Sequence, residues 1–534
     1  MTRRTALALT AVPAAFLAVF FVWPLVSILV TGLAPGGRLD LGPFGEVLTD
    51  GDLLGVAWFT VWQAVASTLL ALLAGLPAAW VFARFDFPGR SLVRALTTVP
   101  FVMPSVVVGA AFIALVGERG LLGLELTGTV WVVLVAHVFY NMAVVIRTVG
   151  ALWSHLDPRL EEAARALGAS PLRTFRTVTL PLLRPALMAA ASIVFLFSFT
   201  SFGIVLLLAG PRITTLEVEI YRHTAVLLDL PVAAVLAMLQ LAGVGLILRS
   251  YARRQDVVEQ PLRAAAETAR RPRSRRERLT IAGIVAATLA FLLGPLALLV
   301  ERSLRAPGGG YGLDGYRAIG RDDGFVDGLQ AIGNSLGFAT VAALIALAIG
   351  LMAAYVVARR AGPLSSWFDT LLMLPLGTSA VTLGFGFIVA LDHPVDLRTA
   401  WILVPLAHAL VAIPFVVRLA VPVLRSMSGR LREAAAVLGA GPAMVWRHVE
   451  LPIVTRAAAV GGAFAFAISL GEFGATVFVA RPGSGTVPLA VFRLLGRPGA
   501  ASAAEAMALA VVLMALTALA VLAVERARLP GSVF

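Results

Sequence analysis

The sequence has no cysteine and no lysine, so all 43 of its basic residues are arginine. Without cysteine, disulfides, thiolate metal sites and thiol nucleophiles are excluded. Without lysine, a P-loop is excluded, because that loop needs a lysine at the terminal phosphates, and so is a lysine Schiff base. If ATP drives this protein, another chain hydrolyses it.

Charged residues are also scarce, at 14% of the chain against 59% hydrophobic residues, with a mean hydropathy of +0.91. A soluble protein carries about 25% charged residues. Many apolar runs exceed the roughly 20 residues that cross a bilayer as a helix, and they do not alternate as barrel strands do. The composition therefore predicts an all-α, multi-pass membrane protein.

The apolar runs predict twelve transmembrane spans, and arginines cluster in alternate loops between them, as the positive-inside rule requires. Both termini are then predicted to lie in the cytoplasm. The first run, Ala6–Val30, is long for a signal peptide and lacks a clear cleavage site, so we expect it to be a retained span. The spans are predicted near residues 8–32, 55–82, 93–116, 129–150, 186–210, 230–250, 280–301, 333–357, 367–391, 400–420, 458–480 and 503–524.

The net charge of +13 follows from this orientation and does not require a nucleic-acid partner. Arginines are densest between Tyr251 and Arg278, which predicts a basic cytoplasmic linker over residues 261–278. Such a segment can also contact anionic lipid headgroups. We therefore expect membrane lipid, and no nucleic acid, as a partner.

A polar block occurs twice, 271 positions apart, and each copy lies between apolar runs. With further matches at nearly the same offset, it predicts two homologous halves of six spans, 1–260 and 279–534, joined by the linker. An even number of spans gives both halves the same orientation. The residues shared by the two copies are Glu162, Ala163, Ala164, Gly168 and Pro181 in the first and Glu433, Ala434, Ala435, Gly439 and Pro452 in the second.

Each block predicts a short cytoplasmic helix, a turn and a second helix. Asp157 and Ser428 stand at the first N-cap, and Gly168 and Gly439 stand where a left-handed residue ends the helix. A proline in each copy, Pro181 or Pro452, is expected to break the second helix before the chain re-enters the membrane.

One face of each short helix is apolar and lined by alanine, which suits a groove on a partner protein. The alternative is that this face packs on the ends of the protein's own spans. Two copies with matching caps, glycines and prolines favour docking. The residues of the two faces are Leu160, Ala163, Ala164 and Leu167, and Leu431, Ala434, Ala435 and Leu438.

The pattern Glu-Ala-Ala-x3-Gly-x9-hydrophobic-x-Leu-Pro resembles the signature of permease subunits of binding-protein-dependent ABC importers with the type I fold. The resemblance covers nearly the whole chain and includes the fused two-half subgroup. It implies a bacterial inner-membrane transport subunit that is not an enzyme and binds no cofactor itself. It further implies that each Glu-Ala-Ala helix is a coupling helix that docks one of two ATPase subunits, and that a periplasmic or lipid-anchored binding protein delivers the cargo.

Several stretches, including Thr214–Tyr221 and Ser469–Gly474, resemble thiamine permeases. The second of these also resembles ferric-iron and polyamine permeases. A small cationic nutrient, with thiamine as the first choice and ferric iron or a polyamine as the alternative, is therefore the expected cargo.

Polar residues within the spans are candidates for the translocation path, because a charge inside a membrane usually faces a wet cavity or the bundle interior. Glu472 would favour a cationic cargo, or would instead hydrogen-bond to a neighbouring helix. The other candidates are His137, Asn141, Ser201 and His408, of which the histidines and the asparagine also suit interhelical hydrogen bonds. No His/Asp/Glu cluster has metal-ligand spacing, so no metal site is predicted.

Two other classes of protein are rivals to this interpretation. A secondary transporter with two six-span halves would need no ATPase and no paired docking helices. A membrane enzyme would need a catalytic set, and we find no paired carboxylates or Ser/His/Asp arrangement at credible spacing.

Overall fold

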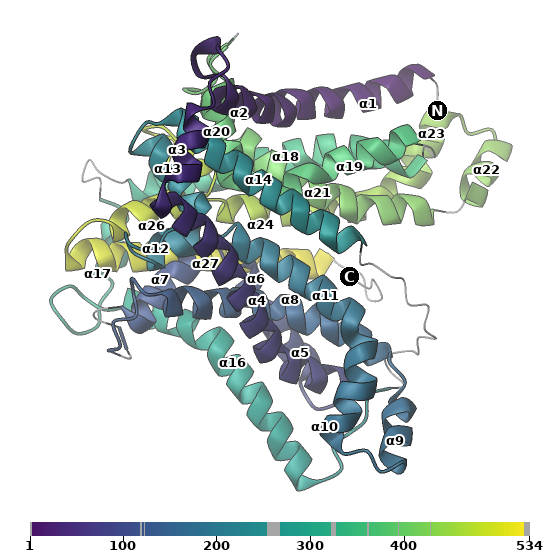
Figure 1. Cartoon of the computed structure of the whole chain (residues 1–534). Helices are drawn as coiled ribbons and strands as arrows, with labels where there is room; N and C mark the ends of the chain where they lie inside the picture. The colour runs from purple at the N-terminus through teal and green to yellow at the C-terminus, as the bar shows by residue number, and fades with distance from the viewer. Residues whose placement is uncertain are drawn as a thin grey trace.

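A computed structural model describes residues 3–117, 120–121, 123–253, 268–321, 327–359, 363–393, 395–427 and 429–527. In these ranges the chain is a bundle of helices, most of them roughly aligned with one another (Figure 1). Nine of the helices are long and apolar enough to cross a membrane, and three bent pairs raise that number to twelve. The fold is therefore the all-α membrane architecture that the composition predicts.

The first half contributes the N-terminal helices and the first coupling region. Its elements are α1 (Arg3–Leu17), η1 (Ala18–Val22), α2 (Trp23–Leu33), η2 (Pro35–Gly37), α3 (Gly42–Thr49), α4 (Gly51–Arg84), α5 (Arg90–Leu96), α6 (Val99–Val102), α7 (Ser105–Val116), α8 (Val130–His155), α9 (Pro158–Ala166), α10 (Pro171–Thr174), η3 (Phe175–Thr179), α11 (Leu180–Phe199), α12 (Gly203–Leu208), α13 (Leu216–Ala225) and α14 (Leu230–Arg253).

The second half repeats this order after residue 268. Its elements are α16 (Arg275–Ser303), α17 (Asp314–Ala318), α18 (Gly328–Arg359), α19 (Pro363–Gly377), α20 (Ala380–Ala390), α21 (Leu403–Ser426), α22 (Gly429–Val437), α23 (Pro442–Val445), η4 (Trp446–Glu450), α24 (Leu451–Gly471), α25 (Thr476–Val479), α26 (Val487–Leu495) and α27 (Ala500–Ala527).

The third span of each half is broken, where the apolar runs predicted continuous helices. The helices bend by 99° between α6 and α7 and by 101° between α19 and α20. In the first half the break is at Pro104, which follows an extended Met103 and has no N–H to continue the helix. In the second half Ser379 is extended and caps α20 through the backbone N–H of Val381.

Pro181 does not break a helix, so that prediction is wrong for the first half. It follows the π-turn η3 directly, and the helical run Pro171–Phe199 continues through it. In the second half Pro452 follows η4 in the same way, and the helix bends by 41° between Thr455 and Ala457. A proline inside a helix removes one hydrogen bond, and a local π-turn is one way in which the freed backbone groups are satisfied. As a result the fifth span begins at Pro171 and ends at Phe199, earlier than the predicted 186–210.

The two halves exchange their first helices. The α1 and α2 helices pack against α18 and α20 of the second half, and α16 packs against α7 and α4 of the first half. In Figure 1, α16 crosses the first half in this way, and α1 runs along α18. The Trp23 indole N–H donates to the Ala390 carbonyl at 3.0 Å, which fixes one of these contacts. Neither half therefore completes its packing alone.

Candidate functional site

The two Glu-Ala-Ala helices, α9 and α22, lie at the same end of the bundle, where α1 also begins (Figure 1). The Asp157 carboxylate accepts from the Arg159 N–H at 3.0 Å and caps α9, as predicted. The predicted cap of α22, Ser428, lies outside the described residues.

Both helices end at the predicted glycines. Gly168 and Gly439 have φ of +87° and +84°, the left-handed region that favours glycine. The next N–H, from Ala169 or Ala440, donates back to the carbonyl of Ala164 or Ala435 at 3.1 and 3.0 Å. This is a complete Schellman motif in each half, so both helices turn sharply into the second helix of the block.

The motif side chains lie on the surface. Glu162, Ala163, Glu433 and Ala434 are exposed, and Ala164 and Ala435 are half-buried. The apolar residues at the ends of these helices are among the most exposed in the described chain, with Leu167 at 89%, Leu438 at 87% and Val437 at 86%. An exposed apolar surface of this kind, on two equivalent helices, is typical of a protein-binding site.

An ion pair attaches each Glu-Ala-Ala region to the end of a long span. In the first half Arg84, at the end of α4, donates to Glu161 on α9 at 3.0 Å, and the Thr179 hydroxyl donates to the same oxygen. In the second half Arg359, at the end of α18, donates to Glu450 on η4 at 2.6 Å. Each of these two regions is thus attached to a long span by an ion pair.

The described part of the linker, from residue 268 on, is also attached here. The Arg270 N–H donates to the Arg84 carbonyl, and the Arg270 carbonyl accepts from Asp86, while buried Thr268 donates to the Ser154 carbonyl. Hydrogen bonds to Glu277 raise the pKa of the Arg270 guanidinium above its usual value. Arg275 and Arg276, assigned to the linker from the sequence, lie in the first turn of α16.

Inside the first half, His137 joins two elements. Its Nδ1 lies 2.9 Å from the Ser67 hydroxyl on α4, and its Nε2 lies 2.8 Å from the Ser201 hydroxyl after α11. The Asn141 amide N–H donates to the His137 carbonyl at 3.0 Å, and the Asn141 Oδ1 has no partner among the described residues. All these side chains but Ser201 are buried.

The second half has a similar hydrogen-bond network around a histidine, with the carboxylate of Glu472 added to it. His408 lies between Ser469 and Thr476, and its Nε2 is 3.1 Å from the Glu472 carboxylate. Glu472 also accepts from the Ala475 and Thr476 N–H groups and from the Thr476 hydroxyl. The carboxylate is buried, and these contacts come from its own segment and from α21 of the same half.

Four aromatic rings form a chain of contacts between the halves. Phe202 and Phe473, which are equivalent residues, stack with centroids 5.5 Å apart and planes inclined by 23°. Tyr221 meets Phe202 edge-on at 5.6 Å, and Phe492 packs on Phe473 at 5.4 Å. The Phe202–Phe473 stack therefore lies on the approximate two-fold axis that relates the halves.

A buried carboxylate next to this cluster was missed by the sequence analysis. Glu217 on α13 accepts from Ser379 of the second half at 2.6 Å and from Gln240 on α14. Its segment was predicted to be an outer loop, because one glutamate among polar neighbours gives no sign of burial. The short helices α13 and α26 fold back into the bundle, which makes their first residues part of the contact between the halves.

The predicted residues thus fall into two groups: the coupling-helix residues at one end, and the candidates His137, Asn141, Ser201, His408 and Glu472 inside. Across the described ranges, no group of three or more His, Cys, Asp or Glu residues is arranged to hold a metal ion.

Comparison with known proteins agrees with this architecture. The model of the family described as "Binding-protein-dependent transport system inner membrane component" matches twice, over residues 71–256 and 346–528. The chain is 31% identical to the thiamine transport system permease protein ThiP of Brucella suis, over 98% of this chain and 97% of the relative. It is 27% identical to ThiP of Escherichia coli K12 over 84% and 85% of the two chains.

A shorter match connects one part of the chain to a different transporter. The sulfate transport system permease protein CysT of Escherichia coli K12 is 32% identical over 44% of this chain and 87% of the relative. The double family match and the full-length relatives agree with the duplicated helical architecture. The chain belongs to the family of binding-protein-dependent transport system inner membrane components, as a multi-pass permease subunit of an ABC importer rather than an enzyme.

Proposed function

We propose that this permease imports thiamine. The main support is the full-length similarity to two proteins named as thiamine permeases. The interior adds chemical support, because buried carboxylates and clustered aromatic rings suit a cationic aromatic molecule, which gains both charge attraction and ring stacking. The sulfate permease similarity covers less than half of this chain, and the buried carboxyl groups of Glu217 and Glu472 offer an anion no positive charge.

The two coupling helices each dock one ATPase subunit. Their exposed leucines enter an apolar groove, and the sharp glycine turns keep each helix rigid against its span. When ATP brings the ATPase subunits together, Arg84 and Arg359 pass the movement to α4 and α18. Both chain termini lie on this cytoplasmic side.

The binding protein delivers cargo at the opposite end, where α3, α13, α17 and α26 lie (Figure 1). The stack of Phe202 on Phe473 closes the path between the halves, and the movement of α4 and α18 separates it. Glu217 then loses its partner Ser379 across the interface and becomes available to a cation.

Uptake of radiolabelled thiamine, ferric iron and sulfate by a strain that lacks this chain tests the proposal. The wild-type chain should restore thiamine uptake alone. Glu217→Gln keeps the shape of the side chain but replaces one acceptor oxygen by an amide N–H donor and prevents ionisation, and should reduce thiamine uptake by roughly tenfold, the equivalent of one ion contact. Restored iron or sulfate uptake without thiamine uptake would contradict the proposed cargo.

A further inference from the structure

A cavity of about 400 Å³ lies beside the first coupling helix, between the cytoplasmic ends of α4 and α8 and the segment formed by α10 and η3. Most of its lining is apolar, and Leu73 at its edge is 68% exposed on the surface of a span. The residues that line the cavity are Leu73, Leu76, Pro77, Trp80, Trp153, Glu161, Arg165, Pro171, Thr174, Phe175 and Thr179.

Two buried polar groups in this lining have no hydrogen-bond partner. Trp153 is 4% exposed and Thr174 is 1% exposed, yet the Trp153 Nε1 and the Thr174 Oγ1 bond to nothing in the described chain. An unpartnered buried donor costs about 1–3 kcal/mol, so such groups are rare in native proteins and call for a reason. A bound molecule with acceptor atoms would explain why these two donors have no partner within the described chain.

The equivalent place in the second half has no such groups. Leu424 and Val445 stand where the first half has Trp153 and Thr174. The equivalents of Trp80 and Phe175 are Tyr355 and Trp446, whose rings meet edge-on at 5.3 Å. The donors are therefore a feature of the first half alone, and the repeat itself does not require them.

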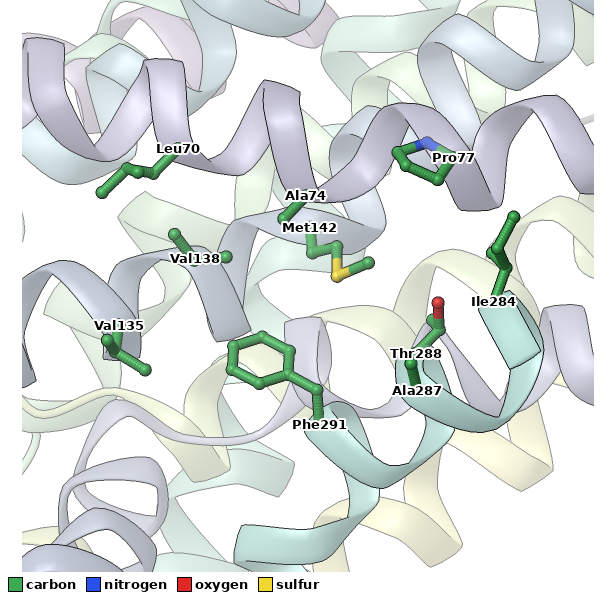
Figure 2. A pocket seen from close by; sticks show the side chains of 10 residues that line it. All are labelled: Leu70, Ala74, Pro77, Val135, Val138, Met142, Ile284, Ala287, Thr288 and Phe291. Carbon is green, nitrogen blue, oxygen red and sulfur yellow. The ribbon is translucent and has the colours of Figure 1, made fainter. Parts of the chain in front are cut away.

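A second cavity adjoins the first. It has a volume of about 510 Å³, shares Pro77 with the first and lies between α4, α8 and α16 (Figure 2). Figure 2 shows Leu70, Val138, Met142 and Phe291 around this space, and its only polar side chain is Thr288. The rise from Leu70 to Trp80 along α4 is roughly 15 Å, so the two cavities form an apolar trough that enters the membrane from its cytoplasmic edge.

The charges at the mouth favour an anion. Arg165 lines the cavity, and the only acidic lining residue, Glu161, is neutralised by Arg84 at 3.0 Å. Trp80 and Trp153 lie where tryptophan is enriched in membrane proteins, at the boundary between hydrocarbon and water. An apolar trough with hydrogen-bond donors and a positive charge at its aqueous end matches a lipid in shape and in charge.

We propose that this trough binds one anionic phospholipid of the surrounding bilayer. The lipid's phosphate or ester oxygens accept from Trp153 and Thr174 and face Arg165, and an acyl chain lies in the second cavity. The lipid contacts both α4 and the segment after α9, so it holds the first coupling region against its span. This inference does not depend on the identity of the cargo.

Native mass spectrometry of the purified full-length chain, delipidated and titrated with phosphatidylglycerol, tests the site. The double variant Trp153→Phe, Thr174→Val keeps an aromatic ring, although a smaller one, at position 153 and the volume at position 174, and removes both donors. It should bind phosphatidylglycerol at the tightest site roughly five- to tenfold more weakly, as expected for one to two lost hydrogen bonds. Thr177→Val, an exposed threonine nearby that donates to the Arg173 carbonyl, is the matched control and should bind as wild type.

Two further measurements separate a lipid from other ligands. Ala287→Trp fills the second cavity without touching the donors, and should weaken phosphatidylglycerol binding as well. Phosphatidylcholine and inorganic phosphate should each bind more weakly than phosphatidylglycerol. Unchanged phosphatidylglycerol binding in the double variant, or inorganic phosphate binding as tightly as the lipid, would overturn the proposal.

Discussion

The two coupling regions are attached to their spans by the same arginine position but by carboxylates from different elements. Arg84 and Arg359 are equivalent residues at the ends of α4 and α18. Arg84 pairs with Glu161 on the coupling helix itself, whereas Arg359 pairs with Glu450, one element later on η4. At the equivalent positions, the second half has Arg432 in place of Glu161, and the first half has Thr179 in place of Glu450.

This difference shows that the repeat has preserved a contact between two elements while the residues that make it have changed. A buried arginine needs a carboxylate within reach, and either of two neighbouring backbone positions can provide it. The mechanical result differs, however. The first coupling helix is bound directly to α4 through Glu161, while the turn after the second is bound to α18 through Glu450.

The docking surfaces should be the same in both halves despite this difference. Leu167→Asp or Leu438→Asp places a charge where a buried leucine contact is proposed, at a loss of about 2–3 kcal/mol, or roughly 30- to 150-fold in ATPase affinity. Affinity for the purified ATPase, measured by biolayer interferometry on the detergent-solubilised chain, checks this. Leu39→Asp, at a leucine that is 78% exposed in an outer loop, is the control. A loss confined to one half would show that only one coupling helix docks.

The ion pairs should differ in their contribution to stability. Arg359→Gln removes the guanidinium that donates to Glu450, whose side chain is 5% exposed and also accepts from the Tyr355 hydroxyl at 3.3 Å, and should destabilise the protein by about 3–5 kcal/mol. Arg84→Gln leaves the more exposed Glu161, at 18%, with its Thr179 hydrogen bond, and should cost about half as much. Thermal unfolding in detergent, followed by intrinsic fluorescence, ranks the two variants. An equal or larger loss from Arg84→Gln would contradict the argument from burial.

The helix caps, the glycine turns and the exposed apolar face could be predicted, because each depends on a local sequence pattern. The caps and glycine turns of α9, and the exposure of Leu167, depend on residues within one or two helical turns, where spacing is informative. The ion pairs are different, because 77 residues separate Arg84 from Glu161 along the chain. The repeated motif drew attention to Glu162, whereas its neighbour Glu161 faces the span and makes the contact.

The contacts between the halves also could not be predicted from the sequence. Phe202 and Phe473 were matched as equivalent residues, but nothing in either segment shows that they stack on each other. Glu217 is buried only because α13 folds back against α14 and α20. In each case the position of a residue follows from packing between distant segments, which hydrophobic periodicity does not encode.

The smallest expected effect comes from moving the second half's carboxylate to the position used by the first. Glu450→Thr alone leaves Arg359 unpaired and should lower the unfolding temperature. Adding Arg432→Glu places a carboxylate at the position equivalent to Glu161. This carboxylate should pair with Arg359, as Glu161 pairs with Arg84 in the first half. The double variant should therefore unfold within about 1 kcal/mol of wild type, which would be a non-additive rescue.

Because the second coupling helix would now be bound directly to its span, ATP hydrolysis and thiamine uptake should stay coupled. If the second substitution adds to the loss caused by the first, the two attachments are not interchangeable, and the turn after each coupling helix has a role of its own.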